Sequence, residues 1–283
     1  MRFSRSRRAM LTAALASPAL LASCGGGESI VSRFSPSRVL LVDGGGNSWG
    51  QDIRNRYGSA PTVVPTGGTD YSLGATPIGA GLGATTLAQR VDLLLAGGVG
   101  GNDLVVLSGG LPDLVALANG TQSTAAASDL GKAMADQVRR LVNAGATRVL
   151  VGNPYNLARS PLFRGGPREA IASGLTRAFN DRLKVSMVDL GGTVLLFDVE
   201  DLVDRIAFAV NNGSGFANFR NASAPACAGS TVGNGSVSGS TCTSGAFGGN
   251  DPGVFLFYDP IYLTEYAQTY FGEQAFNLMR RQW

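Results

Sequence analysis

The chain has 283 residues, of which 44% are hydrophobic and 15% charged, so it can build one full-sized core and global disorder is excluded. Its net charge of +3 comes from the N-terminus, because residues 1–23 hold four arginines and no acid, and without them the net charge is −1. The remaining arginines are scattered, so no basic face for nucleic acid is predicted. The chain has no histidine, which excludes an imidazole base and a histidine metal ligand.

The N-terminus has the pattern of an export signal. Arginines within residues 2–8 precede the apolar residues 9–23, a stretch too short for a transmembrane helix, which needs roughly 20 residues. It ends in Leu21-Ala22-Ser23-Cys24, which resembles a bacterial lipobox and implies cleavage before Cys24 and a lipid on its sulfur. An ordinary signal followed by a chance cysteine is the alternative. Residues 6–11 resemble a twin-arginine motif, so twin-arginine and general secretion both stay open.

After a signal peptide at residues 1–23, we expect a lipidated cysteine and tether at 24–37 and a single domain at 38–283. Gly25 stands where an aspartate marks inner-membrane retention in lipoproteins, so the periplasmic face of the outer membrane is the expected location. No further apolar run reaches 18 residues, which predicts a soluble mature body.

Apolar runs that end in turns predict buried parallel strands at residues 39–43, 103–108, 148–152 and 193–197. Helical apolar spacing predicts helices at residues 87–95, 125–144, 167–188, 200–210 and 263–281. Gly145 is placed to end the second helix and Pro167 to begin the third. This alternation predicts an α/β fold, a three-layer doubly wound sandwich with a mainly parallel sheet.

Residues 211–253 are the one long irregular stretch, rich in Gly, Ser, Asn and Thr. They contain Cys227 and Cys242, and an exported protein makes a disulfide between these two the default expectation. Closing a loop of this size contributes roughly 3 kcal/mol on the chain-entropy model. We expect a disulfide-stapled surface loop at 213–253 and no metal site, because two thiols without a third ligand are too few.

In open parallel sheets, ligands bind beyond the carboxyl ends of the strands, so the turns there are the candidate sites. The first turn, Asp43–Trp49, is glycine-rich, but no Lys-Ser/Thr follows and the spacing matches neither nucleotide-binding pattern. A tight turn is therefore favoured over a phosphate cradle, and no cofactor is expected.

Four turn segments match the signature blocks of a known family. They are Val42–Gly46, residues 70–75 (DYSLGA), residues 103–114 (DLVVLSGGLPDL) and residues 257–264 (FYDPIYLT). Together they resemble the blocks of the SGNH or GDSL ester hydrolases, closest to the branch of lecithinase-like and autotransporter-borne esterases. The intervening residues 149–163 and 215–227 also resemble segments of that branch, so the resemblance spans nearly the whole mature chain. It implies the flavodoxin-like sandwich of SGNH hydrolases.

The resemblance places Gly45 at the nucleophile, Gly74 at the oxyanion glycine, Pro112 at the oxyanion asparagine and Tyr262 at the histidine, with Asp259 retained. Gly45 has no hydroxyl, Pro112 has neither a side-chain amide nor a backbone N–H, and Tyr262 has an ordinary pKa near 10. Loss of the nucleophile or the histidine costs about 10⁶-fold in turnover in subtilisin, and loss of one oxyanion donor about 10²–10³-fold. These substitutions predict a catalytically inactive hydrolase relative.

The rival hypothesis is an active ester hydrolase with a relocated nucleophile. Ser48, Ser72 and Ser108 all lie in or near turns at strand ends. The carboxylates Asp113, Asp259 and Glu265 are its weak candidate bases, and the only lysines, Lys132 and Lys184, fall in predicted helices. Serines at such turns more often cap helices or stabilise turns.

A pocket that has lost its catalytic residues can still bind a ligand. Trp49, Tyr71, Tyr258 and Tyr262 lie beside the motif turns and either line a cleft for lipid, acyl or glycan groups or pack against the sheet edge. A second non-catalytic hypothesis is a cell-envelope scaffold that holds a protein partner through residues 213–253.

Overall fold

The computed structural model describes residues 34–42, 48–59, 76–80, 82, 85–227 and 249–283. Its main sheet has four parallel strands in the order β1-β2-β3-β4. The strands are β1 (Val39–Val42), β2 (Leu104–Ser108), β3 (Val149–Gly152) and β4 (Val194–Phe197). All four confirm the predicted strands to within one residue, because continuous runs of valine and leucine are typical of strands buried on both faces.

Helices follow and separate these strands. They are α1 (Trp49–Arg56), α2 (Leu87–Gly97), α3 (Leu111–Asn119), α4 (Thr124–Asn143), α5 (Glu169–Met187), α6 (Val199–Asn211) and α7 (Glu265–Gln282). The five predicted helices are confirmed, whereas α1 and α3 were not predicted. Gly145 has a φ of +106° just beyond α4, which matches its expected role as a helix stop. Pro167 does not begin α5, since Arg168 is the N-cap.

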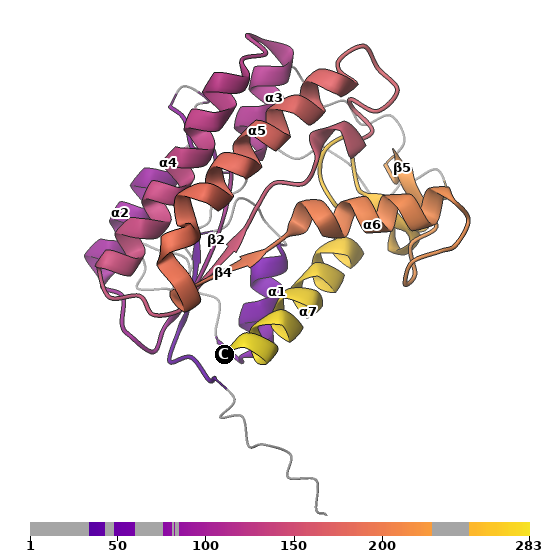
Figure 1. Cartoon of the computed structure of the whole chain (residues 1–283). Coiled ribbons are helices and arrows are strands. Elements are labelled where there is room, and N and C mark those ends of the chain that lie inside the picture. Colours follow the sequence, from indigo (N-terminus) through magenta and orange to yellow (C-terminus); the bar gives the residue numbers. More distant parts are fainter. Residues whose placement is uncertain (1–33, 43–47, 60–75, 81, 83–84, 228–248) are drawn as a thin grey trace, which may run out of the picture. The chain divides into compact units, whose positions relative to one another are not determined.

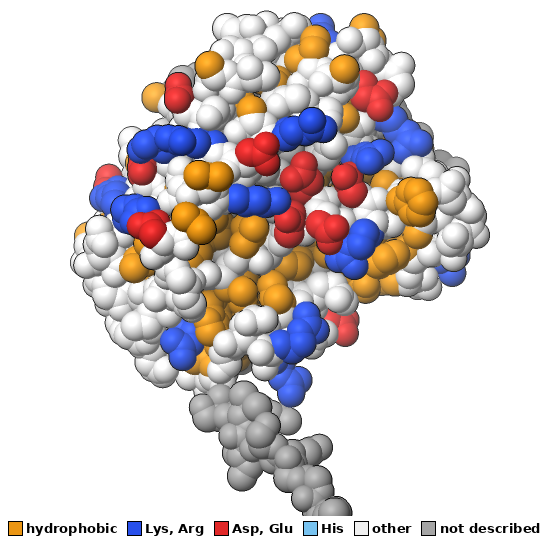
Figure 2. Space-filling view, viewed as in Figure 1, with side chains coloured by type: hydrophobic (Ala, Val, Ile, Leu, Met, Phe, Trp, Pro, Cys, Tyr) orange, Lys and Arg blue, Asp and Glu red, His pale blue; other side chains and the backbone are white. Residues whose placement is uncertain are grey.

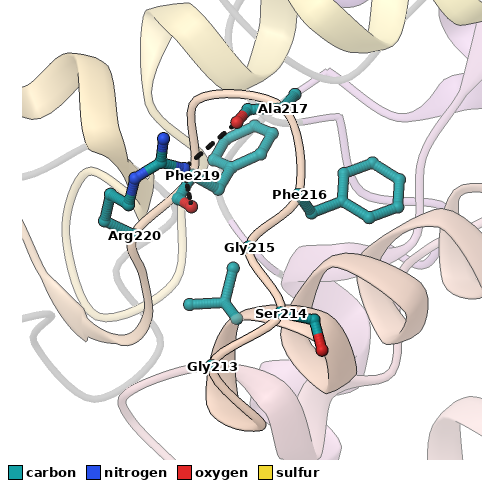
Figure 3. A pocket seen from close by; sticks show the side chains of 8 residues that line it. Gly213, Ser214, Gly215, Phe216, Ala217, Phe219 and Arg220 are labelled. Carbon is teal, nitrogen blue, oxygen red and sulfur yellow. Dashed lines mark hydrogen bonds between the residues drawn. The ribbon is translucent and has the colours of Figure 1, made fainter.

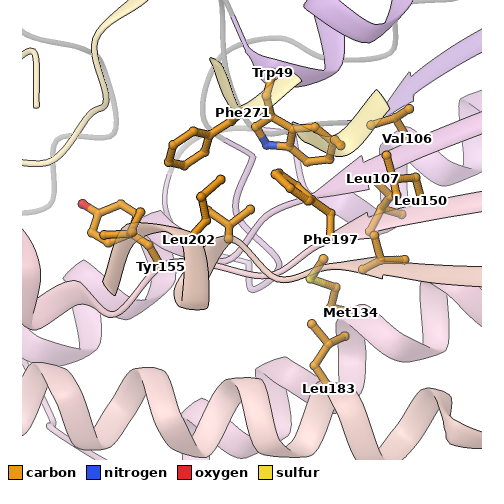
Figure 4. Close-up of a cluster of buried hydrophobic side chains, with 14 of the residues drawn as sticks. Trp49, Val106, Leu107, Met134, Leu150, Tyr155, Leu183, Phe197, Leu202 and Phe271 are labelled. Atoms are coloured by element: carbon orange, nitrogen blue, oxygen red, sulfur yellow. The ribbon is translucent and has the colours of Figure 1, made fainter. Parts of the chain in front are cut away.

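The helices cover both faces of the sheet (Figure 1). Helices α2, α3, α4 and α5 pack together on one face, and α1 and α7 pack against each other on the opposite face. The core fills the space between these layers. In Figure 4, Trp49 and Phe271 lie on one side of Phe197, while Met134 and Leu183 come from the helices on the other.

A second, two-stranded parallel sheet pairs β5 (Asn221–Pro225) with β6 (Phe255–Phe257). Strand β5 corrects the prediction that residues 211–253 are irregular throughout. Its sequence NASAP is polar and ends in proline, so it carries none of the β-branched or aromatic residues that predict strands. Short 3₁₀ helices lie at Leu157–Arg159, Val188–Thr193 and Pro252–Val254.

Candidate functional site

The turns at the carboxyl ends of β1 to β4 are the expected position of a site. Gly45, Gly74 and the pocket candidate Tyr71 lie outside the described residues, as do Ser72 and Cys24. The geometry of the site is therefore built from the turns after β2, β3, β4 and β6, which contain the other sequence-predicted residues.

The turn after β2 leads directly into α3. Gly110 has a φ of +90°, and a Cβ there would lie 2.7 Å from the ring of Phe179, so both backbone conformation and space require glycine. Pro112 lies in the first turn of α3, where a missing N–H costs no helical hydrogen bond. Pro112 is thus placed as a helix-starting residue, and it offers no donor to an oxyanion.

Asp113 is buried and serves as an acceptor for a distant backbone segment. Its two carboxylate oxygens accept hydrogen bonds from the N–H groups of Ile78 at 2.9 Å and Gly79 at 2.8 Å. Burial raises the pKa of Asp113, and the two hydrogen bonds offset only part of that rise. Both oxygens hold backbone in place, which argues against Asp113 as a free general base.

The turn after β6 contains Asp259 and Tyr262, two of the sequence-predicted site residues. Asp259 is fully buried, and its Oδ1 accepts hydrogen bonds from the N–H groups of Ile261 at 2.7 Å and Tyr262 at 2.6 Å. Burial, and secondly the charge of Asp259, raise the pKa of the Tyr262 phenol further above its usual value of 10. Tyr262 therefore stays protonated at neutral pH.

Tyr155, which sequence reasoning did not single out, anchors this turn to the end of β3. Its hydroxyl donates a hydrogen bond to the carbonyl of Ile261 at 2.5 Å, and its ring packs edge-on against Phe257 at 5.7 Å. Complete burial, with the nearby Asp259 and Tyr262, raises the pKa of Tyr155 well above 10. The only signal in the sequence was a tyrosine three residues beyond a buried strand.

The described residues that follow β1 show capping and packing contacts. Ser48 is the N-cap of α1, and its hydroxyl accepts a hydrogen bond from the N–H of Gln51 at 3.4 Å. The Trp49 ring is buried against Phe197 with ring centroids 5.2 Å apart, and a Cβ on Gly152 would lie 2.4 Å from it. The backbone N–H of Trp49 also donates a hydrogen bond to Oε1 of Gln268 in α7 at 3.0 Å. These contacts match the packing interpretation of Trp49.

A polar network that the sequence did not predict joins the ends of β3 and β4. The Asn153 side chain donates to Asp198 at 3.0 Å and accepts from the N–H of Val199 at 2.7 Å, which ties the start of α6 to β3. Lys184 donates to Asp198 at 2.8 Å and lies 4.0 Å from Glu200.

The pKa shifts in this network favour the charged forms of Lys184 and Asp198. Burial lowers the pKa of Lys184, but its hydrogen bond to Asp198 more than compensates and the net shift is upward. Burial opposes the ionised form of Asp198, and the hydrogen bonds from Lys184 and Asn153 outweigh it, so its pKa is lowered. Burial raises the pKa of Glu200. Lys184 therefore remains protonated and paired, which does not suit a general base.

The start of the predicted surface loop forms a hollow of about 540 Å³. Eight residues line it: Val210, Gly213, Ser214, Gly215, Phe216, Ala217, Phe219 and Arg220. Figure 3 shows the Arg220 guanidinium directed at two backbone carbonyls, those of Ala217 at 3.1 Å and Phe219 at 2.9 Å. Cys227 is buried, and Cys242 lies outside the described residues, so their disulfide stays a prediction.

Within the described ranges, no three acidic or cysteine side chains come together as metal ligands would. None of the described helices combines the length and the apolar character that a membrane span requires. No protein-family model and no curated protein matches this chain. The geometry therefore establishes an α/β protein with a parallel four-stranded sheet and flanking helices.

Proposed function

We propose that the chain is an exported cell-envelope lipoprotein with an SGNH/GDSL hydrolase fold that has lost catalysis and binds a lipid, acyl or glycan ligand. The helix layers support this fold. Helices α2, α4 and α5 lie on one face of the parallel sheet, and α1 and α7 lie on the other, which is the three-layer arrangement of α/β folds with helices on both faces.

One observation carries the proposal of lost catalysis: the residue at the position of the family's histidine is a buried phenol that holds its proton. A general base needs a pKa near the working pH, and both burial and Asp259 move the pKa of Tyr262 away from it. The carboxylate that would orient an imidazole instead accepts two backbone N–H groups. Without a base, a serine nucleophile would remain unactivated.

The proposal also includes a lipid anchor on Cys24. Cys24 lies outside the described residues, so lipid attachment there rests on the lipobox resemblance alone. The described body begins at Phe34, ten positions after Cys24. A lipid on Cys24 would hold the body at a membrane surface, most simply the periplasmic face of the outer membrane.

The ligand-binding part can be tested with tryptophan fluorescence. Trp49 and Trp283 are the only tryptophans, and Trp283 donates a hydrogen bond to Gly192 before β4, remote from the strand carboxyl ends. A Trp283→Phe variant therefore leaves Trp49 as the sole reporter. Titration with phospholipid, acylated glycan and peptidoglycan fragments should change its emission and raise the melting temperature. No change with any of these ligands would contradict the binding proposal.

The scaffold hypothesis has the hollow beside α6 in its favour, because an open concave surface next to the long loop offers a place for a partner chain. Replacing Val210 and Phe216, which line the hollow, by serine should then abolish partner capture in the envelope while leaving the circular dichroism spectrum unchanged. Capture that survives the replacement would reject this function.

The active-hydrolase alternative requires a relocated serine. Ser48 already caps α1, and Ser108 is the last residue of β2 and only half-buried. Hydrolysis assays with serine-to-alanine variants decide between this alternative and the inactive scaffold.

A further inference from the structure

Strand β4 forms one edge of the described sheet. It pairs with β3 along Val149–Gly152, and no described strand pairs with its other side. In a parallel ladder, alternate residues turn their N–H and C=O groups toward each side. The outward groups of β4 thus have no strand partner in the described part of the chain, and such an edge is a template for another strand.

The surface around this edge is apolar. Val194, Leu195 and Leu196 are only partly buried. The 3₁₀ helix that leads into β4 begins with Val188, which is 80% exposed, and Val185 in the last turn of α5 is 65% exposed. Figure 2 shows apolar side chains gathered over the part of the face where β4 runs between α5 and α7. Proteins usually protect an open edge with lysine, proline or an inward-pointing charge. The sequence of β4, Val-Leu-Leu-Phe, contains none of these.

The charges at the two ends of this edge are opposite. At its amino-terminal end, the Trp283 indole N–H donates to the carbonyl of Gly192 at 3.0 Å, which brings the exposed Arg280 and Arg281 close to the start of β4. At its carboxyl end, the start of α6 holds three carboxylates, those of Asp198, Glu200 and Asp201, against the two cations that pair with them, Lys184 and Arg205, so one negative charge is in excess. In Figure 2, acidic side chains with basic ones beside them lie at the end of the apolar strip where α6 begins, and basic side chains lie beyond its other end.

We propose that β4 pairs antiparallel with β4 of a second copy of this chain, across a two-fold axis, so that one sheet runs through both subunits. A two-fold contact uses the same patch twice, and an uncharged strand meets no like charge when it faces itself. The same axis brings Arg280 and Arg281 of one copy to the acidic first turn of α6 of the other. Val188 and Val185 flank the paired strands and are covered by the contact.

The test is the oligomeric state of the full chain carrying Cys24→Ser, which removes the proposed lipid attachment site. Light scattering and sedimentation over a concentration series should show a reversible dimer. Val188→Lys should weaken it at least about tenfold, which corresponds to about 1.4 kcal/mol. Phe208→Lys is the matched control, because Phe208 is 73% exposed on α6, and it should leave the dimer unchanged. Melting temperatures would verify that both variants fold.

Hydrogen exchange supplies a second readout, because the outward amides of β4 should gain protection as the concentration rises. A monomer at every concentration would overturn the proposal. So would a dimer that Val188→Lys leaves intact, or one that Phe208→Lys weakens equally. A dimer in which protection appears outside β4 would also reject this interface.

Discussion

The two helical layers that cover the sheet are held by different kinds of contact. In the α4–α5 layer, helices approach so closely that a Cβ on Gly131 would lie 2.3 Å from the backbone carbonyl oxygen of Phe179. In the α1–α7 layer, Gly272 meets the Asp52 side chain instead, and the Trp49 N–H is bound by the Gln268 side chain. The Phe179 carbonyl is fixed in the backbone of α5. The Asp52 carboxylate can rotate away from α7, but the Asp52 Cβ, also 2.5 Å from a Cβ built on Gly272, moves only with α1.

This difference matters because two of the candidate turns lie next to this layer: α1 follows the turn after β1, and α7 follows the turn after β6. The α1–α7 layer, which adjoins the first and last of the candidate turns, is thus held in part by side-chain contacts. Substitutions there should alter the site region without unfolding the protein. Substitutions in the α4–α5 layer should instead act on the stability of the whole fold.

The largest effect is expected from Gly131→Ala. The added methyl group has no room beside a backbone carbonyl, so the free energy of unfolding should fall by about 3 kcal/mol. Gly174→Ala in α5 is the matched control, because its Cβ would meet nothing within 4 Å. It should raise stability by about 0.5–1 kcal/mol. Urea denaturation of both variants measures the contrast, and equal effects would refute the close α4–α5 contact.

Asp113→Asn should cost about 2 kcal/mol, because one carboxylate oxygen becomes a donor facing a backbone N–H. The exposed Asp136→Asn is the control and should change stability by less than about 1 kcal/mol. Since the folded-state pKa of Asp113 is raised, the folded chain binds this proton first as the pH falls. Wild-type stability relative to Asp113→Asn should therefore decrease as the pH rises above about 4, because the unfolded chain loses this proton there before the folded chain does. The opposite slope would show that the carboxylate is not buried as described.

Gln268→Ala should cost about 1 kcal/mol, the usual net value of one hydrogen bond. In a Trp283→Phe background it should also change the emission of Trp49, because the backbone N–H of Trp49 loses its partner. Gln274→Ala lies on the same helix without a described side-chain hydrogen bond and should change neither property. An unchanged Trp49 signal in Gln268→Ala would mean that α7 does not position the start of α1.

The smallest effect is expected from Lys184→Met. Its ion pair with Asp198 is more than one-third exposed, so solvent screening limits its contribution to less than about 1 kcal/mol. Thermal unfolding should show a slight shift at most. A loss several times larger would mean that this network holds α6 in place far more strongly than an exposed ion pair can.

The sequence predicted those elements whose own residues specify them. The four strands are unbroken apolar runs, and α4 carries Met134, Val138 and Leu141 at helical spacing. Helix α1 was missed because only Trp49 and Ile53 of its eight residues are large and apolar. Helix α3 was missed because Gly110 and Pro112 suggest a turn, although here they form the helix start.

For the site, the motif pattern gave the positions of Pro112, Asp259 and Tyr262 but not what these residues contact. Asp113 binds Ile78 and Gly79, which lie more than thirty positions away, and Tyr155 reaches Ile261 across more than one hundred. Such contacts depend on how the sheet brings distant turns together. No local pattern in the sequence contains that information.

Ester hydrolysis by the purified protein tests the central claim, loss of catalysis, most directly. Short-chain and phospholipid esters should be offered to the wild type and to a variant combining Gly45→Ser, Pro112→Asn and Tyr262→His. We predict no turnover by the wild type and a measurable gain in the triple variant, because the nucleophile, the oxyanion donor and the base are restored together. Wild-type turnover that disappears with Ser48→Ala, Ser72→Ala or Ser108→Ala would contradict the claim and establish a relocated active site.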